Sequence, residues 1–168
     1  TVNFVANGTT ANATLSAASA VTNGSGVASV TATSNATVGS YTVTATAVGG
    51  SNPANTFALT NTVGTPASLA ASGGTPQSAV ISTGFGSALA ATVTDSGGNP
   101  ISGVTVNFVA NGTTANATLS AASAVTNGSG VASVTATANG TLGSYTVTAT
   151  AVGGSSPADT FALSNNGG

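Results

Sequence analysis

Apolar and polar residues alternate in short runs along the whole chain, and Gly, Asn, Pro and Ser interrupt these runs. A period of two is typical of strands with one buried face, because successive side chains of a strand point to opposite sides. The clearest run covers residues 145–152, where Tyr145 begins the apolar series and Thr146 the polar one. No run has the 3.6-residue period of a helix, so the sequence predicts an all-β fold.

Seven strands can be placed in residues 64–168, separated by turns that are rich in Gly and Asn. They are expected at residues 67–71 with an extension at 79–81, 88–94, 104–110, 117–120, 131–137, 145–152, and around Phe161 and Leu163. This number of short strands, each with one buried face, fits two antiparallel sheets packed together. The sequence therefore predicts an immunoglobulin-like antiparallel β-sandwich.

Residues 1–64 reappear almost unchanged as residues 105–168, at an offset of 104 positions, and only eight of the 64 aligned pairs differ. A period of this length is a whole small domain rather than one turn of a solenoid. We therefore expect tandem repeats of about 104 residues, with a complete immunoglobulin-like repeat at 64–168. Residues 1–63 are expected to be the C-terminal portion of another repeat.

That first portion has no equivalents of Leu69, Leu89 and Val93. A sandwich without its first strands would expose its core and its strand edges. We expect sequence ahead of Thr1 to complete it, and strands lent by another chain are the alternative. The end of the chain, residues 165–168, carries no spare strand to lend, which favours the first explanation.

Charge is almost absent: the chain has no Lys, Arg or His, and only Asp95 and Asp159 are charged. Without cationic side chains it cannot neutralise phosphates, which argues against binding to nucleic acid or to anionic lipid. No stretch is apolar over the roughly 18 residues that a membrane helix needs, so no membrane insertion is expected. The Ser and Thr hydroxyls have no His or Lys as a base, so we expect no catalytic residue, no cofactor and no enzyme activity.

Eight asparagines head an Asn-x-Ser/Thr triplet, the formal acceptor for an N-linked glycan. They are Asn7, Asn12, Asn23, Asn35, Asn111, Asn116, Asn127 and Asn139. A chain this rich in Asn, Ser and Thr contains several such triplets by composition alone, and O-linked glycans on Ser or Thr are a further alternative. Glycosylation is thus a possible modification that the pattern by itself does not establish.

Three other residues are candidates for structural roles. Asp95 opens a turn of consecutive turn-forming residues. It is expected to cap its own backbone rather than to bind calcium, since one carboxylate is too few for a site of six to eight oxygens. Tyr145, and Tyr41 in the first copy, begin a strand after a Gly-Ser pair. Each is either a tyrosine corner or a plain core aromatic residue, and the sequence leaves both open.

Three segments together carry a resemblance to a known family: residues 91–108, which begin ATVTDSGGNP, residues 126–132, TNGSGVA, and residues 143–149, GSYTVTA. In this order they resemble bacterial immunoglobulin-like domains of the invasin and intimin type, and the resemblance covers the whole chain. It implies a sandwich domain repeated in large bacterial surface proteins, where it acts as stalk, spacer or adhesin body. It carries over no catalytic residues, and this chain departs from many members in having no lysine.

The leading hypothesis is therefore a non-enzymatic extracellular or cell-surface structural protein of a bacterium, forming a stalk, sheath or filament. The alternative is an adhesin module that binds a glycan or a host or abiotic surface through its loops, which would require aromatic clusters at the loop ends. Self-association is expected, since the sheet edges lack the lysines that usually protect them. Association between neutral surfaces would depend little on salt.

Overall fold

Sixteen strands and no helix make up the computed structural model, which describes all residues from Thr1 to Gly168. The all-β class predicted from the alternation is confirmed. No helix long and apolar enough to cross a membrane is present. The chain divides into two compact units, Thr1–Val63 and Gly64–Gly168, and each is described by itself.

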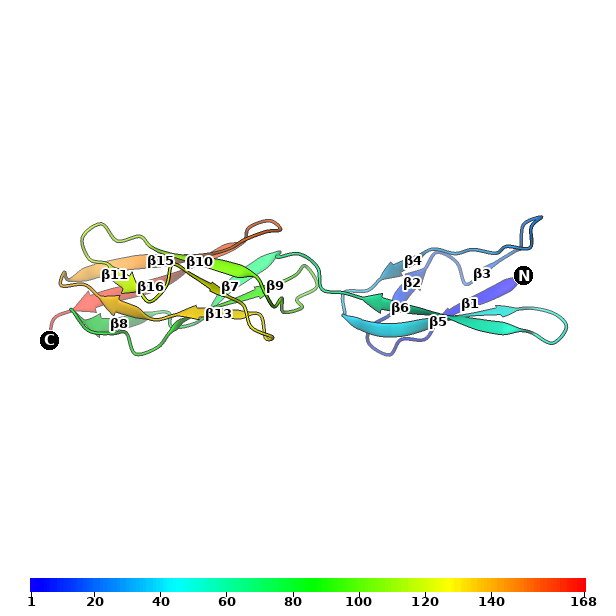
Figure 1. The fold of residues 1–168 in the computed structure, drawn as a ribbon, viewed down its shortest axis with the longest axis horizontal. Coiled ribbons are helices and arrows are strands. Elements are labelled where there is room, and N and C mark those ends of the chain that lie inside the picture. Colours follow the sequence, from blue (N-terminus) through cyan, green and yellow to red (C-terminus); the bar gives the residue numbers. More distant parts are fainter. The chain divides into compact units, whose positions relative to one another are not determined.

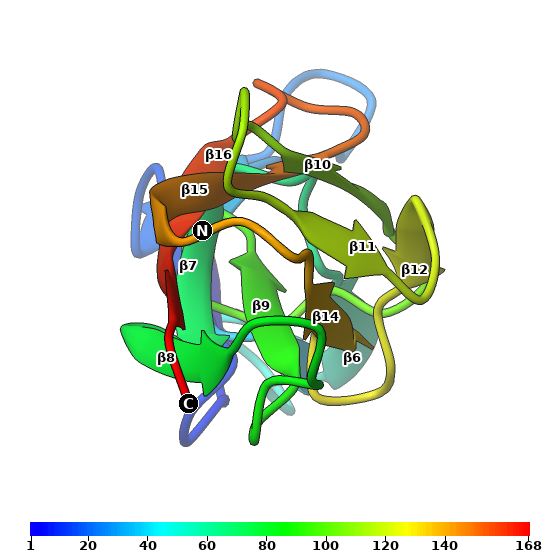
Figure 2. The same cartoon turned by 90° about the vertical axis from the view of Figure 1, so that its left-hand side faces the viewer.

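The unit Gly64–Gly168 is a sandwich of two main sheets (Figures 1 and 2). The first sheet contains, in order, β12 (Ser123–Val125), β10 (Thr105–Ala110), β15 (Gly143–Ala151), β16 (Ala158–Asn166) and β8 (Gln77–Val80). The second contains β13 (Val131–Val134), β9 (Leu89–Thr94) and β7 (Ser68–Gly73). A further pair is formed by β11 (Ala117–Leu119) and β14 (Ala136–Ala138). The predicted immunoglobulin-like sandwich is confirmed.

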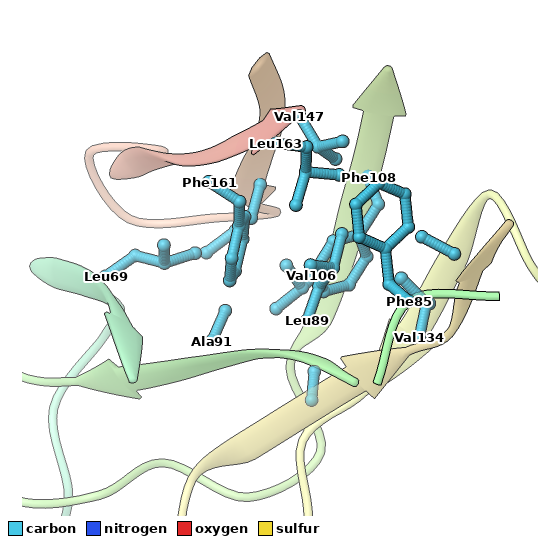
Figure 3. Close-up of a cluster of buried hydrophobic side chains, with 14 of the residues drawn as sticks. Leu69, Phe85, Leu89, Ala91, Val106, Phe108, Val134, Val147, Phe161 and Leu163 are labelled. Carbon is cyan, nitrogen blue, oxygen red and sulfur yellow. The ribbon is translucent and has the colours of Figure 1, made fainter. Parts of the chain in front are cut away.

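The core between the sheets is built from residues of alternating positions on each strand. In β9, Leu89, Ala91 and Val93 are fully buried, and in β15 Val147 and Ala149 are fully buried, as the period of two requires. Many inward positions carry only Ala or Val, so the few large side chains fill much of the space. Figure 3 shows this cluster, and the rings of Phe108 and Phe161 in it lie 6.2 Å apart at an interplanar angle of 39°.

The structure differs from the predicted strand map in three places. The expected extension at 79–81 is a separate strand, β8, which joins the opposite sheet and runs parallel to β16, as Leu163 pairs with Gln77. The expected single strand at 131–137 is two strands, because β13 pairs with β9 while β14 pairs with β11. The short edge strand β12 was not predicted. Each difference concerns which strand is the partner, which local alternation does not encode.

The unit Thr1–Val63 contains one sheet and one strand pair. The sheet has the order β3 (Ser19–Ala20), β1 (Val2–Ala6), β5 (Gly39–Ala47) and β6 (Ala54–Asn61), and the pair is β2 (Ala13–Leu15) with β4 (Ala32–Ser34). Its registers repeat those of the second unit at the offset of 104, since Val2 pairs with Ala47 as Val106 pairs with Ala151. It has no counterpart of the β13-β9-β7 sheet.

Equivalent side chains therefore have different surroundings in the two units. Phe161 is 0% exposed in the second unit, whereas its equivalent Phe57 is 54% exposed in the first. The strands β6 and β16 that carry them have the same pairing to β5 and β15. The missing cover of the second sheet, rather than a local difference, thus accounts for the exposed ring.

These two phenylalanines allow a matched test of that cover. The variant Phe161→Ala is expected to lower the free energy of unfolding of the unit 64–168 by about 3–5 kcal/mol, because it leaves a cavity in a closed core. The matched variant Phe57→Ala is expected to cost less than about 1 kcal/mol, because the ring it removes is already half in water. Denaturant titrations of both variants followed by circular dichroism provide the measurement. Equal losses would contradict the difference in burial.

Candidate functional site

The carboxylate of Asp95 is the most heavily bonded polar group of the chain. Its Oδ1 accepts hydrogen bonds from the backbone N–H groups of Gly97 and Asn99, both at 2.9 Å, and its Oδ2 accepts one from the N–H of Gly64 at 2.9 Å. The Asn99 Nδ2 lies 3.1 Å from each oxygen. Asp95 is only 6% exposed. Both oxygens are thus engaged by N–H donors, the arrangement of a residue that caps its own turn and also holds the first residue of the unit.

These donors favour the ionised form of the carboxylate. The N–H of Gly64, followed by the backbone and side chain of Asn99, lowers the pKa of Asp95 to about 2. Asp159 is held in a similar way by the N–H groups of Ala71 at 2.9 Å and Thr160 at 2.8 Å, and these lower its pKa. Both acids therefore stay charged at neutral pH and bind their own chain. No group of three or more His, Cys, Asp or Glu side chains comes together.

A buried asparagine holds the far end of the last strand. Asn165, 2% exposed, donates from Nδ2 to the carbonyls of Asn116 and Thr141, each at 3.1 Å, and to Oδ1 of Asn139 at 2.9 Å. Asn61 repeats this network in the first unit. Sequence reasoning missed both residues, because an asparagine after an alternating run looks like an ordinary turn residue.

Tyr145 joins the same network. Its hydroxyl donates to Oδ1 of Asn165 at 3.0 Å, and burial raises its pKa. A tyrosine corner would instead bond to backbone a few residues upstream, so that interpretation is wrong for Tyr145. Tyr145 is a core aromatic residue with a polar anchor on the neighbouring strand, and Tyr41 is buried at the equivalent position.

The eight candidate glycosylation asparagines differ in what their Nδ2 atoms do. Six of them donate from Nδ2 to the protein itself, for example Asn116 to the carbonyl of Gly112 at 2.9 Å and Asn139 to that of Thr114 at 2.7 Å. The others in this group are Asn7, Asn12, Asn35 and Asn111. Asn23 and Asn127 are exposed turn residues that use only Oδ1, as when Asn127 accepts from Ser129 at 2.9 Å. Their Nδ2 atoms are accessible for modification.

The outward side of β15, the central strand of the five-stranded sheet, carries hydroxyl groups and no charge. Thr146, Thr148 and Thr150 of β15 point away from the buried residues between them. Asn111 donates to the Thr148 hydroxyl at 2.7 Å, and Thr148 pairs across the sheet with Thr160. The first unit repeats the arrangement, with Asn7 bonded to Thr44 at 2.8 Å. The two units thus share a neutral outer side at this strand.

The edges of the sandwich are protected by means other than lysine. The edge strand β12 has three residues, and β8 and β13 have four each. The longer edge strand β7 has an irregular register between Ala71 and Gly73, and the N–H of Ala71 is taken by Asp159. Short and irregular edges are poor templates for a further strand. In this unit the edge geometry therefore disfavours pairing between bare edges, whereas the first unit has the eight-residue strand β6 at an edge of its sheet.

No aromatic cluster forms at the loop ends. Of the five Phe and two Tyr, only Phe57 is exposed, while the other six are buried. A shallow groove of about 720 Å³ lies across residues of β8, β15 and β16, and its lining includes Gln77, Ser144, Thr146 and the buried Tyr145 but no charged residue. The groove offers hydroxyl and amide groups without an exposed ring on which a sugar could stack.

The sandwich, its turns and its buried anchors place the chain among immunoglobulin-like β-sandwich proteins. Residues 75–163 match the family of bacterial Ig-like domains (group 1). The match covers more than half of the chain, which therefore belongs to this family. The resemblance to invasin- and intimin-type domains expected from the sequence is confirmed.

Solved structures of similar fold include adhesins. The Escherichia coli adhesin FdeC is 18% identical with a TM-score of 0.55, and the match covers 99% of this chain and 52% of that one. The D00-D0 domain of intimin is 29% identical with a TM-score of 0.48, covering 76% of this chain and 64% of that one. The D0-D1 domain of intimin is 27% identical with a TM-score of 0.47, covering 98% and 80%. No curated protein matches the chain.

The pKa of Asp95 predicts a pH window for stability. Because its pKa is lowered on folding, the ionised group stabilises the fold above its unfolded pKa near 3.8, and this contribution is lost as the pH falls towards 2. The variant Asp95→Asn is expected to lower the melting temperature at pH 7, with a difference from the parent that shrinks between pH 4 and pH 2. Asp159→Asn, which introduces the residue found at Asn55 in the first copy, should show a loss with the same direction of pH dependence, because the pKa of Asp159 is also lowered. A constant Asp95→Asn difference from pH 7 to pH 2 would contradict the assignment.

The free Nδ2 atoms predict where a glycan can be attached. In a host that adds N-linked glycans, we expect occupancy at Asn23 and Asn127 and little at the half-buried Asn116. Attachment at Asn116 would break the hydrogen bond from its Nδ2 to the carbonyl of Gly112. Mass spectrometry of glycopeptides gives the occupancy of each asparagine. Equal occupancy at Asn116 and Asn127 would show that the hydrogen bonds of Nδ2 do not control attachment.

Proposed function

We propose that this chain is part of a non-enzymatic structural protein outside the bacterial cell or on its surface, built from tandem immunoglobulin-like domains that form a stalk, sheath or filament. The observation that carries the proposal is the repetition itself. The two copies of the 64-residue sequence fold with the same strand registers, so the chain repeats one structural unit. Repetition of a domain without change of its surface serves length and continuity rather than a single binding event.

The use of the polar groups supports a structural role. The two carboxylates bind backbone N–H groups, and the buried asparagines bind loops of their own unit. No side chain is left as a base beside a hydroxyl. These groups stabilise the domain, and none of them is positioned to act on a substrate.

We further propose that copies of the chain associate through the neutral outer side of the sheet, represented by Thr146, Thr148 and Thr150. Without charges, two such surfaces meet with no repulsion and release few ions. In the second unit the edge strands β12 and β8 are short, which makes this side a better contact than the edges of that unit. The association should therefore depend little on the salt concentration.

An adhesin module that binds a glycan or a host or abiotic surface is the competing function. The exposed groove beside β8 lacks a free aromatic ring, which makes it a poor sugar site. A glycan array distinguishes the two functions, because an adhesin module would bind a defined set of sugars with saturation. Such binding by this chain would contradict a purely structural role.

Electron microscopy at low salt and at about 1 M salt, where the Debye length is about 3 Å, tests the structural proposal directly. We expect ordered lateral contacts between copies that persist at the high salt concentration. The variant Phe57→Ser is the control, because it reduces contacts through the exposed ring of the first unit and leaves the hydroxyl side unchanged. Assemblies that vanish in Phe57→Ser, or that dissolve at high salt, would overturn the proposed contact.

A further inference from the structure

The unit Thr1–Val63 exposes apolar side chains that its twin buries. Val27 is exposed and Val30 only half-buried, whereas Val134, the equivalent of Val30, is buried. The backbone differs in the same place: Val131–Val134 forms β13, while residues 27–30 are not part of any strand. Identical sequence thus has two states, one covered and one uncovered.

The side of the first unit that lacks a cover contains a surface cavity. This cavity has a volume of about 460 Å³. Seven large apolar side chains that line it define what we call the open face: Phe4, Leu15, Val27, Val30, Val43, Phe57 and Leu59. Apart from that of Val27, their equivalents in the second unit belong to, or pack against, the core cluster that also contains Leu69 of β7 and Leu89, Ala91 and Val93 of β9. Figure 3 shows Leu69 and Ala91 directed towards the ring of Phe161, the position of Phe57 in the first unit.

In the second unit the cover is residues 64–104, here called the cover segment. It supplies Leu89, Ala91 and Val93 as fully buried side chains, and its strand β9 pairs with β13. This segment packs on residues 105–168. It is therefore not available to cover the open face of residues 1–63 in the same chain.

The residues that line the hollow are the same in the two copies. None of the eight positions at which residues 1–64 differ from 105–168 lines the hollow; the differing positions are 34, 36, 38, 52, 55, 60, 62 and 63. An acceptor with the same side chains at the same registers selects the same occupant, by strand pairing and by alternate side chains entering the hollow.

We propose that the open face of residues 1–63 is a binding site for a second cover segment, a polypeptide with the sequence pattern of residues 64–104 supplied by a further repeat of the 104-residue series. The occupant adds a strand beside residues 27–30, as β9 does beside Val131–Val134, and buries Phe57. The open face is the inner side of the sheet, whereas the proposed lateral contact uses the outer side. The proposal therefore does not depend on lateral assembly.

One difference between the copies tunes this site. Asp159 accepts the N–H of Ala71 in the cover segment at 2.9 Å, while the first unit has Asn55 at this position, whose Oδ1 is bonded to Thr56. The amide nitrogen of Asn55 cannot accept a hydrogen bond. The open face therefore binds the segment with one charge-assisted bond fewer, and Asn55→Asp is expected to strengthen the binding about 3- to 10-fold.

The test adds a peptide of residues 64–104 to the full chain and measures affinity by calorimetry and amide hydrogen exchange by mass spectrometry. We expect saturable 1:1 binding that slows exchange at residues 27–30 by about tenfold or more and leaves residues 131–134 unchanged. Fragments that include Ser34 or Ala138 report the two copies separately. The control is the same peptide with Leu89→Asp and Val93→Asp, which should not bind.

Three results would overturn the proposal: no slowing at residues 27–30, equal binding of the control peptide, or a dimer of two open faces that saturating peptide does not dissociate. A fused chain, with residues 64–104 joined ahead of Thr1, guards against a poorly soluble peptide. In the fused chain Phe57→Ala should become as destabilising as Phe161→Ala, and the Leu89→Asp, Val93→Asp version of the added segment should abolish that change. Phe57→Ala with unchanged cost in the fused chain would also refute the site.

Discussion

The cover that β7 and β9 place over the five-stranded sheet is the contact on which the rest of the sandwich depends. Inward positions of the sheet are mostly Ala and Val, which bury little area each, so stability rests on closing both layers around a few large side chains. Leu69 and Ala91 of this cover are directed towards Phe161, which is fully buried. The first unit has the corresponding sheet without a counterpart of β8 and without that cover, and its buried core is reduced to Phe4, Ala11, Tyr41 and Val43.

A chain with two charges must anchor its loops by other means. Asparagine does most of this work, since one amide both donates and accepts: Asn165 and Asn61 each reach loops more than 20 residues away. No buried side-chain N or O atom lacks a partner. The turn after Asn127 also needs Gly130, whose φ is +73° and where a Cβ would lie 2.7 Å from the carbonyl oxygen of Val93. Neutral composition is thus compatible with a fully bonded interior.

The features that the sequence predicts correctly are local, and those it misses join distant residues. Alternation located β9, β10 and β15 to within two residues, because the period of two depends only on neighbours. It did not indicate that β8 would join the opposite sheet or that β13 and β14 would separate, since both depend on a partner strand. At the site, the turn of Asp95 was predictable, but its bond to Gly64, 31 residues away, and the bond of Tyr145 to Asn165 were not.

Residues 64–104 pack on residues 105–168, which follow them in the chain, and not on the nearly identical residues 1–63, which precede them. The short turn at 95–100, closed by Asp95 and by the bridge between Thr94 and Pro100, leads β9 directly towards β10. Asp159 then accepts the N–H of Ala71, and the preceding copy has Asn55 there. The turn makes the following partner near in sequence, and this one substitution makes it better bonded. Both act in the same direction, so two almost equal acceptors do not give two competing folds.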